Sequence, residues 1–304
     1  MIGESKKKER EPLNRVGGAV RISFIVNFPR SGSTLLQALL ATQKGVCPLP
    51  ETHFYSAIRK ACTFGPGGII NPECLPAVFE SLGRKLSVEL DDGEREMIGN
   101  LASVGRLGSR DLFLILVSAM RRRFPLDAGL DAMVLEKTPH HALYLDTIAS
   151  EFPEAAFVAI VRHPLAAIQS FKERFSSRHQ WTYRELAAKW RCFQDSIDSF
   201  AASRGGLIVS LRYEDLVARI GESLTGICRH LGLEYDESRL VRRGEHKESF
   251  VMVGEDWKRG VFDDSIVNNN AASLSRIDPN EAQWLAEELS EYMERFGYAR
   301  PEAQ

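Results

Sequence analysis

The chain has 304 residues, and its 39 lysines and arginines nearly balance its 41 aspartates and glutamates, for a net charge of −2 at pH 7. This length suits one large α/β domain or two small ones, and the balanced charge argues against a nucleic-acid-binding protein. No apolar run approaches the roughly 18 residues that a membrane-spanning helix needs, and Met1–Arg15 lacks the apolar core of a signal peptide. We therefore expect a cytoplasmic protein with neither nucleic acid nor a membrane as a partner.

The first predicted elements form a strand, a loop and a helix. Residues 1–18 are highly charged, and we predict that they are disordered. The apolar run Val20–Phe28 predicts a core strand, and Leu35–Ala41 has the apolar spacing of a helix. The polar loop between them would leave backbone N–H groups without partners at the start of the helix, where the helix dipole is positive. This order of elements predicts a site for phosphate or a similar oxyanion.

The rest of the chain alternates between helical and strand-like segments. Residues 54–130 lack strong strand signals and are predicted to form a largely helical insert. Val134-Leu135 predicts a short strand, and the apolar runs Ala156–Val161 and Leu207–Leu211 predict strands buried on both faces. Asn280–Phe296 predicts a final amphipathic helix.

Such alternation predicts an α/β fold, with a three-layer core, a mostly parallel sheet, the P-loop-like strand–loop–helix and the helical insert. We find no internal repeat and no clear linker, so residues 19–304 are predicted to form a single domain. Ligands of such sheets bind at the carboxyl ends of the strands. Three predicted strands end in turns that contain Arg30, Lys137 and Arg162, so we expect one polyanion to lie across this edge.

The cysteines number five, are widely spaced and include no Cys-x-x-Cys pair. This pattern is typical of reduced thiols rather than of a disulfide framework or a zinc site. We therefore expect reduced and mostly buried thiols at Cys47, Cys62, Cys74, Cys192 and Cys228.

The anion-binding loop differs from the ordinary phosphate loop, G-x-x-x-x-G-K-[ST]. With Gly32 aligned, Asn27 replaces the first glycine and Ser33 replaces the lysine, while Thr34 keeps the hydroxyl. The missing lysine argues against an ATPase or a kinase. It does not argue against an anion site, because the backbone N–H groups and hydroxyls remain and Arg30 supplies a forked cation.

Four blocks of sequence, in order, resemble the PAPS-dependent sulfotransferases, where PAPS is 3′-phosphoadenosine 5′-phosphosulfate. The layout is most similar to that of the bacterial and protein-tyrosine types. The resemblance runs from about residue 22 to residue 233. The four blocks are Pro29–Leu36, Glu136–Pro139, Val161–Pro164 followed by Ser170, and Arg212–Leu216.

The resemblance implies transfer of a sulfuryl group from PAPS to a hydroxyl of a small-molecule or peptide-borne acceptor, with adenosine 3′,5′-bisphosphate (PAP) as product. It also implies a set of PAPS-binding residues. Those for the 5′-phosphosulfate would be Arg30, Ser31, Gly32, Ser33 and Thr34. Those for the 3′-phosphate would be Arg162 and Ser170, eight residues apart, with Arg174 in support. Tyr213 would lie near the adenosine, and a late basic loop with Lys258 and Arg259 would close over the cofactor.

The acceptor must lose a proton as its oxygen attacks sulfur, so a general base is needed near the loop. The protein-tyrosine sulfotransferases carry a catalytic Glu followed by Thr at the place that Glu51 occupies here, which favours Glu51 as the base. Classical cytosolic members use a histidine further along, which leaves His53, His140 and His141 as rivals.

Negative charge grows on the leaving phosphate during the transfer, and Arg30 and Lys137 are the cations that we expect to stabilise it. No metal is expected, because no carboxylate after a core strand resembles a Mg²⁺ ligand. Two other functions stay open: a divergent ATP-dependent small-molecule kinase and a non-catalytic nucleotide-binding protein. The sequence contains no motif that identifies the acceptor, and it does not indicate the oligomeric state, for which a homodimer is one alternative.

Overall fold

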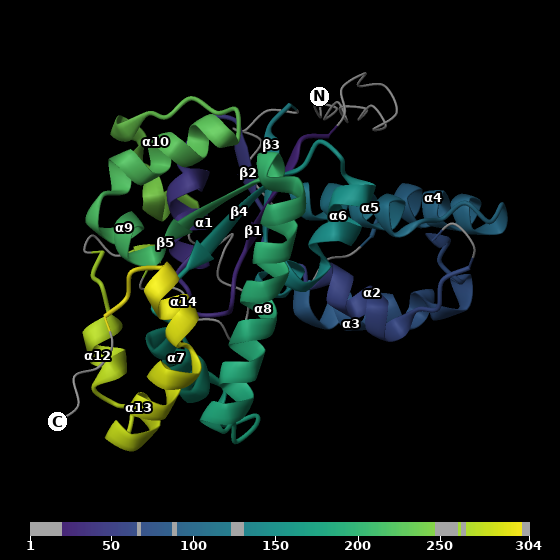
Figure 1. Cartoon of the computed structure of the whole chain (residues 1–304). Helices are drawn as coiled ribbons and strands as arrows, with labels where there is room; N and C mark the ends of the chain where they lie inside the picture. The colour runs from purple at the N-terminus through teal and green to yellow at the C-terminus, as the bar shows by residue number, and fades with distance from the viewer. Residues whose placement is uncertain are drawn as a thin grey trace, which may run out of the picture.

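The computed structural model describes residues 20–65, 68–86, 90–122, 131–246, 261–262 and 266–299. Its centre is a five-stranded sheet in the order β2-β3-β1-β4-β5 (Figure 1), and every adjacent pair of strands is parallel. The predicted α/β fold with a mostly parallel sheet is confirmed. The strands are β1 (Ile22–Val26), β2 (Val46–Pro48), β3 (Met133–Lys137), β4 (Ala156–Val161) and β5 (Ile208–Arg212).

Side chains of the central strands alternate between two apolar layers. Phe24 and Val26 of β1 enter one core cluster, and Ile25 between them enters the other. The Ile25 face packs against α1 (Ser33–Ala41), α9 (Tyr213–Ala218) and α10 (Ile220–His230). The Phe24 face packs against α6 (Leu145–Glu151), α7 (Pro164–Phe175) and α8 (Tyr183–Arg204). Helices on both faces of the sheet give the three layers that the continuous apolar runs predict.

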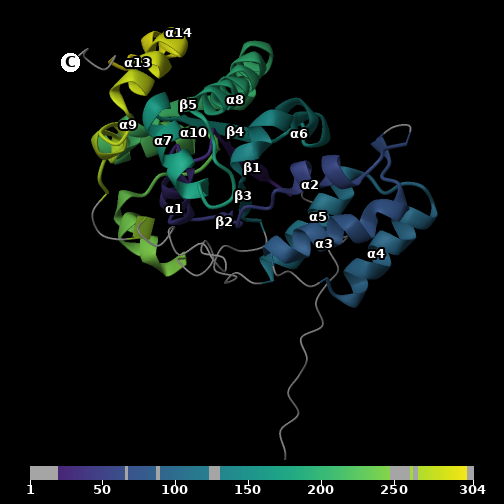
Figure 2. The ribbon, with the colours of Figure 1, turned by 90° about the horizontal axis from the view of Figure 1, so that it is seen from below.

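The predicted insert is largely helical within the residues that the structure describes. It contains α2 (Phe54–Ala61), a 3₁₀ segment η3 (Pro72–Cys74), α3 (Leu75–Leu86), α4 (Asp92–Ser103) and α5 (Ser109–Arg121). These helices form a lobe on the opposite side of the sheet from α9 and α10 (Figures 1 and 2). Phe113 of α5 joins the lobe to the main core, since its ring centroid lies 6.0 Å from that of Phe24.

Three elements differ from the predictions. β2 was not predicted, because Pro48 and Pro50 disfavour a strand; as an edge strand it tolerates them. The long helix α8 also lies outside the predicted elements, although a capping box between Thr182 and Glu185 begins it. The predicted final helix is two helices, interrupted at the fully buried Leu289. The C-terminal helices are α12 (Asn270–Leu274), α13 (Pro279–Glu288) and α14 (Ser290–Arg295).

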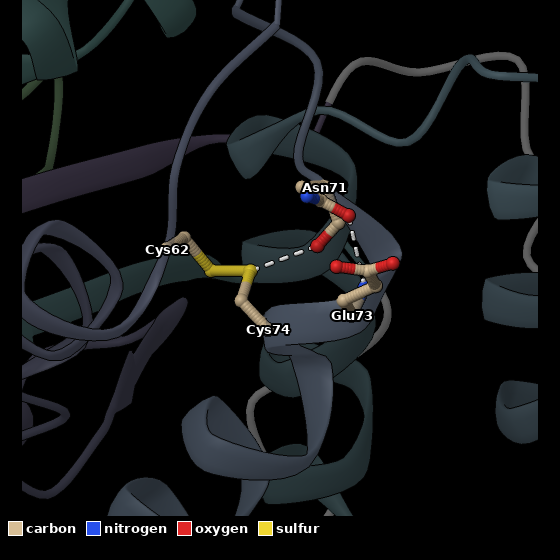
Figure 3. Close-up of a disulfide and its surroundings, with 4 residues drawn as sticks. All are labelled: Cys62, Asn71, Glu73 and Cys74. Atoms are coloured by element: carbon tan, nitrogen blue, oxygen red, sulfur yellow. Dashed lines mark hydrogen bonds between the residues drawn. A yellow bond between two sulfur atoms is a disulfide. The ribbon is translucent and has the colours of Figure 1, made fainter.

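The prediction of reduced cysteines is wrong at one pair. Cys62 follows α2 and Cys74 ends η3, and their sulfurs form a disulfide that closes a loop within the insert (Figure 3). An antiparallel bridge between Phe64 and Ile70 folds this loop back on itself and brings the two cysteines together, although their sequence spacing carries no signal. Cys47, Cys192 and Cys228 are free thiols.

Shorter segments complete the described chain: η5 (Pro139–Tyr144), η6 (Gly205–Leu207) and η7 (Glu237–His246). Within the described residues, no helix is long and apolar enough to cross a membrane. The predicted disorder of residues 1–18 concerns a segment outside the described residues.

Candidate functional site

The anion-binding loop joins β1 to α1 in a conformation that only glycine allows at its last position. Gly32 has a φ of 94°, and a Cβ atom there would lie 2.4 Å from the ring of Tyr213. The hydroxyl of Ser31 donates to the carbonyl of Phe28 at 2.7 Å, which holds the turn closed. The first intrahelical bond runs from Leu36 N to the Gly32 carbonyl, and no side chain caps the start of α1. Its first N–H groups therefore face the loop as donors for an anion.

Arg30 links this loop to the helix after β4. Its φ of 74° is unusual for a residue with a side chain. Its Nε donates to the Ser170 hydroxyl on α7 at 3.1 Å, and Arg162 donates from Nη1 to the Arg30 carbonyl at 3.1 Å. The loop, the end of β4 and α7 thus meet, as the predicted assignment of Arg30, Arg162 and Ser170 to one bound cofactor requires.

The electrostatics of this corner favour a bound anion. Burial, followed by the positive charges of Arg162 and Arg174, lowers the pKa of the Arg30 guanidinium to about 10, against a smaller opposing effect of Glu51. Burial likewise lowers the pKa of Arg162. Concentrated positive charge in a partly buried corner is destabilising by itself, and an oxyanion relieves it.

Two residues that sequence analysis missed hold Arg162 in place. Asn270 accepts from Nε at 2.7 Å, and the Ser273 hydroxyl accepts from Nη2 at 3.4 Å, both from α12. The guanidinium carbon lies 5.0 Å from the centroid of the Tyr213 ring, which also covers Gly32. The run of asparagines at the start of α12 predicts a loop, but nothing in the sequence indicates that this segment packs against the end of β4.

A second group of side chains converges beside the loop. Lys137, at the end of β3, forms an ion pair with Glu51 Oε1, and its Nζ lies 3.3 Å from the Thr34 hydroxyl. The Lys137 side chain is 2% exposed and that of Glu51 is 15% exposed. His53 Nε2 lies 3.4 Å from the other carboxylate oxygen of Glu51. The predicted base, the predicted cation and one of the rival histidines therefore lie together at the carboxyl ends of the strands.

A buried carboxylate, Glu136, supports this group from behind. It accepts from the backbone N–H and hydroxyl of Thr52 at 3.2 and 2.8 Å, and from the hydroxyl of Thr138 at 2.6 Å. His141 Nδ1 lies 2.9 Å from its other oxygen. Burial would raise the pKa of Glu136, but His141 and the hydroxyl donors outweigh it and the pKa is lowered. Glu136 thereby connects Thr52, which follows Glu51, to Thr138, which follows Lys137, and its position in the sequence does not reveal this role.

The remaining rival histidines occupy different surroundings. His141 is fully buried against Glu136. His140 is partly buried, with its ring centroid 6.1 Å from that of His53 and 5.3 Å from that of Phe193 on α8. Burial, followed by the charges of His53 and Lys189, lowers the pKa of His140 to about 3, so this imidazole is neutral at neutral pH.

Not every predicted site residue can be located. Arg174 lies on α7, close enough to Arg30 to act on its pKa, and Ser33 begins α1. Lys258 and Arg259 lie outside the described residues. Across the described ranges, no group of three or more histidine, cysteine or acidic side chains is arranged to hold a metal ion.

Comparison with known proteins identifies the fold and the family. A family model described as "Sulfotransferase family" matches residues 23–237. The chain is 23% identical over 276 residues to nodulation protein NoeE of Sinorhizobium fredii, an alignment of 84% of this chain that spans 60% of the relative's length.

Solved structures share the fold. The sulfotransferase domain from the curacin biosynthetic pathway superposes with a TM-score of 0.60 at 20% identity, over 93% of this chain and 99% of that one. Mouse sulfotransferase SULT7A1 complexed with PAP superposes with a TM-score of 0.51 at 12% identity, over 90% of this chain and 84% of that one.

Proposed function

The chain belongs to the sulfotransferase family, and on that premise we propose that it transfers a sulfuryl group from PAPS to a hydroxyl group of a small-molecule or peptide-borne acceptor. The family match agrees with the function inferred from the sequence and favours it over the kinase and the non-catalytic protein. The acceptor oxygen attacks sulfur, the bond from sulfur to the bridging phosphate oxygen breaks, and the products are a sulfate ester and PAP.

The observation that carries the proposal is the junction of Arg30, Ser170 and Arg162. It joins the loop expected to bind the 5′-phosphosulfate to the residues expected to bind the 3′-phosphate. The uncapped start of α1 and the closely spaced arginines suit a ligand with anionic groups at two positions, as PAPS has. The mouse structural neighbour was crystallised with PAP.

We assign the general base to Glu51. Its carboxylate is partly exposed beside the loop, between Lys137 and His53, whereas His141 is fully buried and paired with Glu136. The low pKa of His140 makes it a weak proton acceptor at neutral pH. His53 is adjacent to Glu51, and its role is to orient the carboxylate.

Lys137 supplies the cation for the leaving group. Its Nζ lies near both Glu51 and Thr34, so a small movement of the ammonium takes it from the carboxylate to an oxyanion held by the loop. Arg30 acts on the same charge from the other side of the loop. This arrangement supplies the positive charge that the lysine of an ordinary phosphate loop would provide.

Lys258 and Arg259 remain our choice for a basic loop over the cofactor. We propose a cytoplasmic location, although the Cys62–Cys74 disulfide is a feature more typical of oxidising compartments.

A direct test is a screen of phenols, alcohols, sugars and amines for sulfate transfer from PAPS, read by mass spectrometry. We expect sulfated products with hydroxyl acceptors in the presence of PAPS and none with ATP–Mg²⁺ in its place. Phosphorylated products with ATP, or no product with any acceptor, would contradict the proposal.

A further inference from the structure

Helix α8 contains a cation that the proposed mechanism does not use. Lys189 lies on α8 and is half-buried, with its Nζ 5.5 Å from the centroid of the Phe193 ring and 5.7 Å from that of Trp181. Aromatic faces attract a cation, but this attraction is weak where water has access to the cation.

No acidic side chain compensates this cation within the part of the chain that the structure describes. The Lys189 ammonium has no hydrogen bond or ion pair there. Burial lowers the pKa of its ammonium, and the positive charge of Lys60 on α2 lowers it further, while Cys192 has an opposing effect. A partly buried lysine beside a second lysine is unfavourable unless an anion binds to it.

A continuous row of side chains connects Lys189 to the catalytic group. The Phe193 ring that contacts Lys189 is 5.3 Å from His140, and His140 is 6.1 Å from His53. His53 in turn lies 3.4 Å from the Glu51 carboxylate. One end of this row is the Glu51 carboxylate, the proposed base, and the other end is the Lys189 ammonium. The His140 imidazole between them is uncharged because its pKa is low.

We propose that Lys189 binds an anionic group of the acceptor, so that the substrate carries a carboxylate or a phosphate in addition to the hydroxyl that is sulfated. The anion lies at Lys189, the acceptor passes the partly exposed His140 imidazole, and the hydroxyl reaches Glu51. Lys60, exposed at the end of α2, adds to the attraction from the insert. This inference rests on the proposed function and specifies its acceptor.

The test uses matched acceptors on the same phenolic and aliphatic skeletons: hydroxy acids, their primary amides, and hydroxyalkyl or hydroxyaryl phosphate monoesters. We expect kcat/KM for the anionic members to exceed that for the amides by about tenfold to hundredfold, the effect of one charge-assisted contact. The Lys189→Met variant, which keeps the apolar stem on the rings, should remove this preference by raising KM for anionic acceptors while sparing the amides. Comparison of the acids with the phosphate monoesters identifies which oxyanion the site takes.

Lys172→Met is the matched control, because Lys172 also lies over an aromatic ring, at 5.0 Å from the Tyr183 centroid, but on α7 and outside the row. The Lys172→Met variant should prefer anionic acceptors over the amides as strongly as the unaltered protein does. Melting temperatures of both variants test for folding defects.

A calorimetric titration with PAP separates the two proposals. Failure to bind PAP defeats the proposed function and this inference together. PAP binding with equal turnover of anions and amides, with no turnover of any anionic member, or with a preference that survives Lys189→Met, overturns the inference alone.

Discussion

Lys137 and Glu51 form an ion pair at the carboxyl ends of β3 and β2, with the lysine side chain almost fully buried. The pair joins the residue that we assign to the leaving group with the residue that we assign to the acceptor proton. Removal of either partner leaves a charge with little access to water, which makes the pair sensitive to substitution.

Glu51→Gln should reduce kcat by about 10²–10⁴-fold, the contribution of a positioned general base. Binding of PAP should be retained or strengthened, because the Lys137 ammonium is released toward the anion. Steady-state kinetics and calorimetry measure the two quantities. His53→Gln provides the comparison and should reduce kcat by about tenfold or less. If His53→Gln reduced kcat more than Glu51→Gln does, His53 rather than Glu51 would be the general base.

Arg162→Ala should weaken PAP binding by about 30-fold to 150-fold, since the substitution removes a charge-assisted contact of about 2–3 kcal/mol. The effect should appear in Kd, with little change in the melting temperature of the free protein, because loss of a crowded positive charge offsets the loss of the Asn270 and Ser273 contacts. The control is Arg219→Ala, because Arg219 is an exposed arginine between α9 and α10 that pairs with Asp215. A Kd within threefold of the unaltered protein would remove Arg162 from the site.

Much of this site could be predicted from the sequence because it lies at strand ends. The apolar runs of a parallel sheet are easy to recognise, and their carboxyl ends must share one edge, so Arg30, Lys137 and Arg162 could be assigned to a common ligand. Asn270 and Ser273 could not, because they reach Arg162 by a return of the chain across more than a hundred residues. The supporting role of Glu136 could not be predicted either, because its hydrogen bonds to Thr52 and Thr138 depend on the relative positions of β2 and β3. The Cys62–Cys74 pairing depends on the fold of one loop and was predicted wrongly.

The low pKa of His140 predicts a loss of stability on mild acidification. The pKa of His140 in the folded protein, about 3, lies below its ordinary value of 6.5. Below pH 6.5, His140 is therefore protonated in the unfolded chain but stays neutral in the folded protein. The free energy of unfolding should therefore fall by about 1 kcal/mol between pH 7 and pH 5.5. Urea unfolding at the two pH values measures the change. His140→Phe should reduce it; an unchanged pH dependence in that variant would show that His140 is protonated normally in the folded protein.

Removal of the disulfide should destabilise the insert. The double variant Cys62→Ser, Cys74→Ser should lower the free energy of unfolding by about 2–3 kcal/mol, the entropy that a short closed loop removes from the unfolded chain. Urea unfolding with mass-spectrometric thiol counting tests this expectation. Cys192→Ser, which replaces an exposed free thiol, should have no such effect. Equal stability of the double variant, or free thiols at both positions under oxidising conditions, would contradict the pairing.

The central claim is that the junction of Arg30, Ser170 and Arg162 binds a nucleotide with a 3′-phosphate and an anionic group at the 5′ position. Calorimetric titration of the full chain with PAP, 5′-AMP and ATP–Mg²⁺ tests it most directly. We predict micromolar binding of PAP and at least about hundredfold weaker binding of 5′-AMP, because 5′-AMP lacks the phosphate that Arg162 and Ser170 would contact. Equal affinity for PAP and 5′-AMP, or tighter binding of ATP–Mg²⁺ than of PAP, would contradict the account.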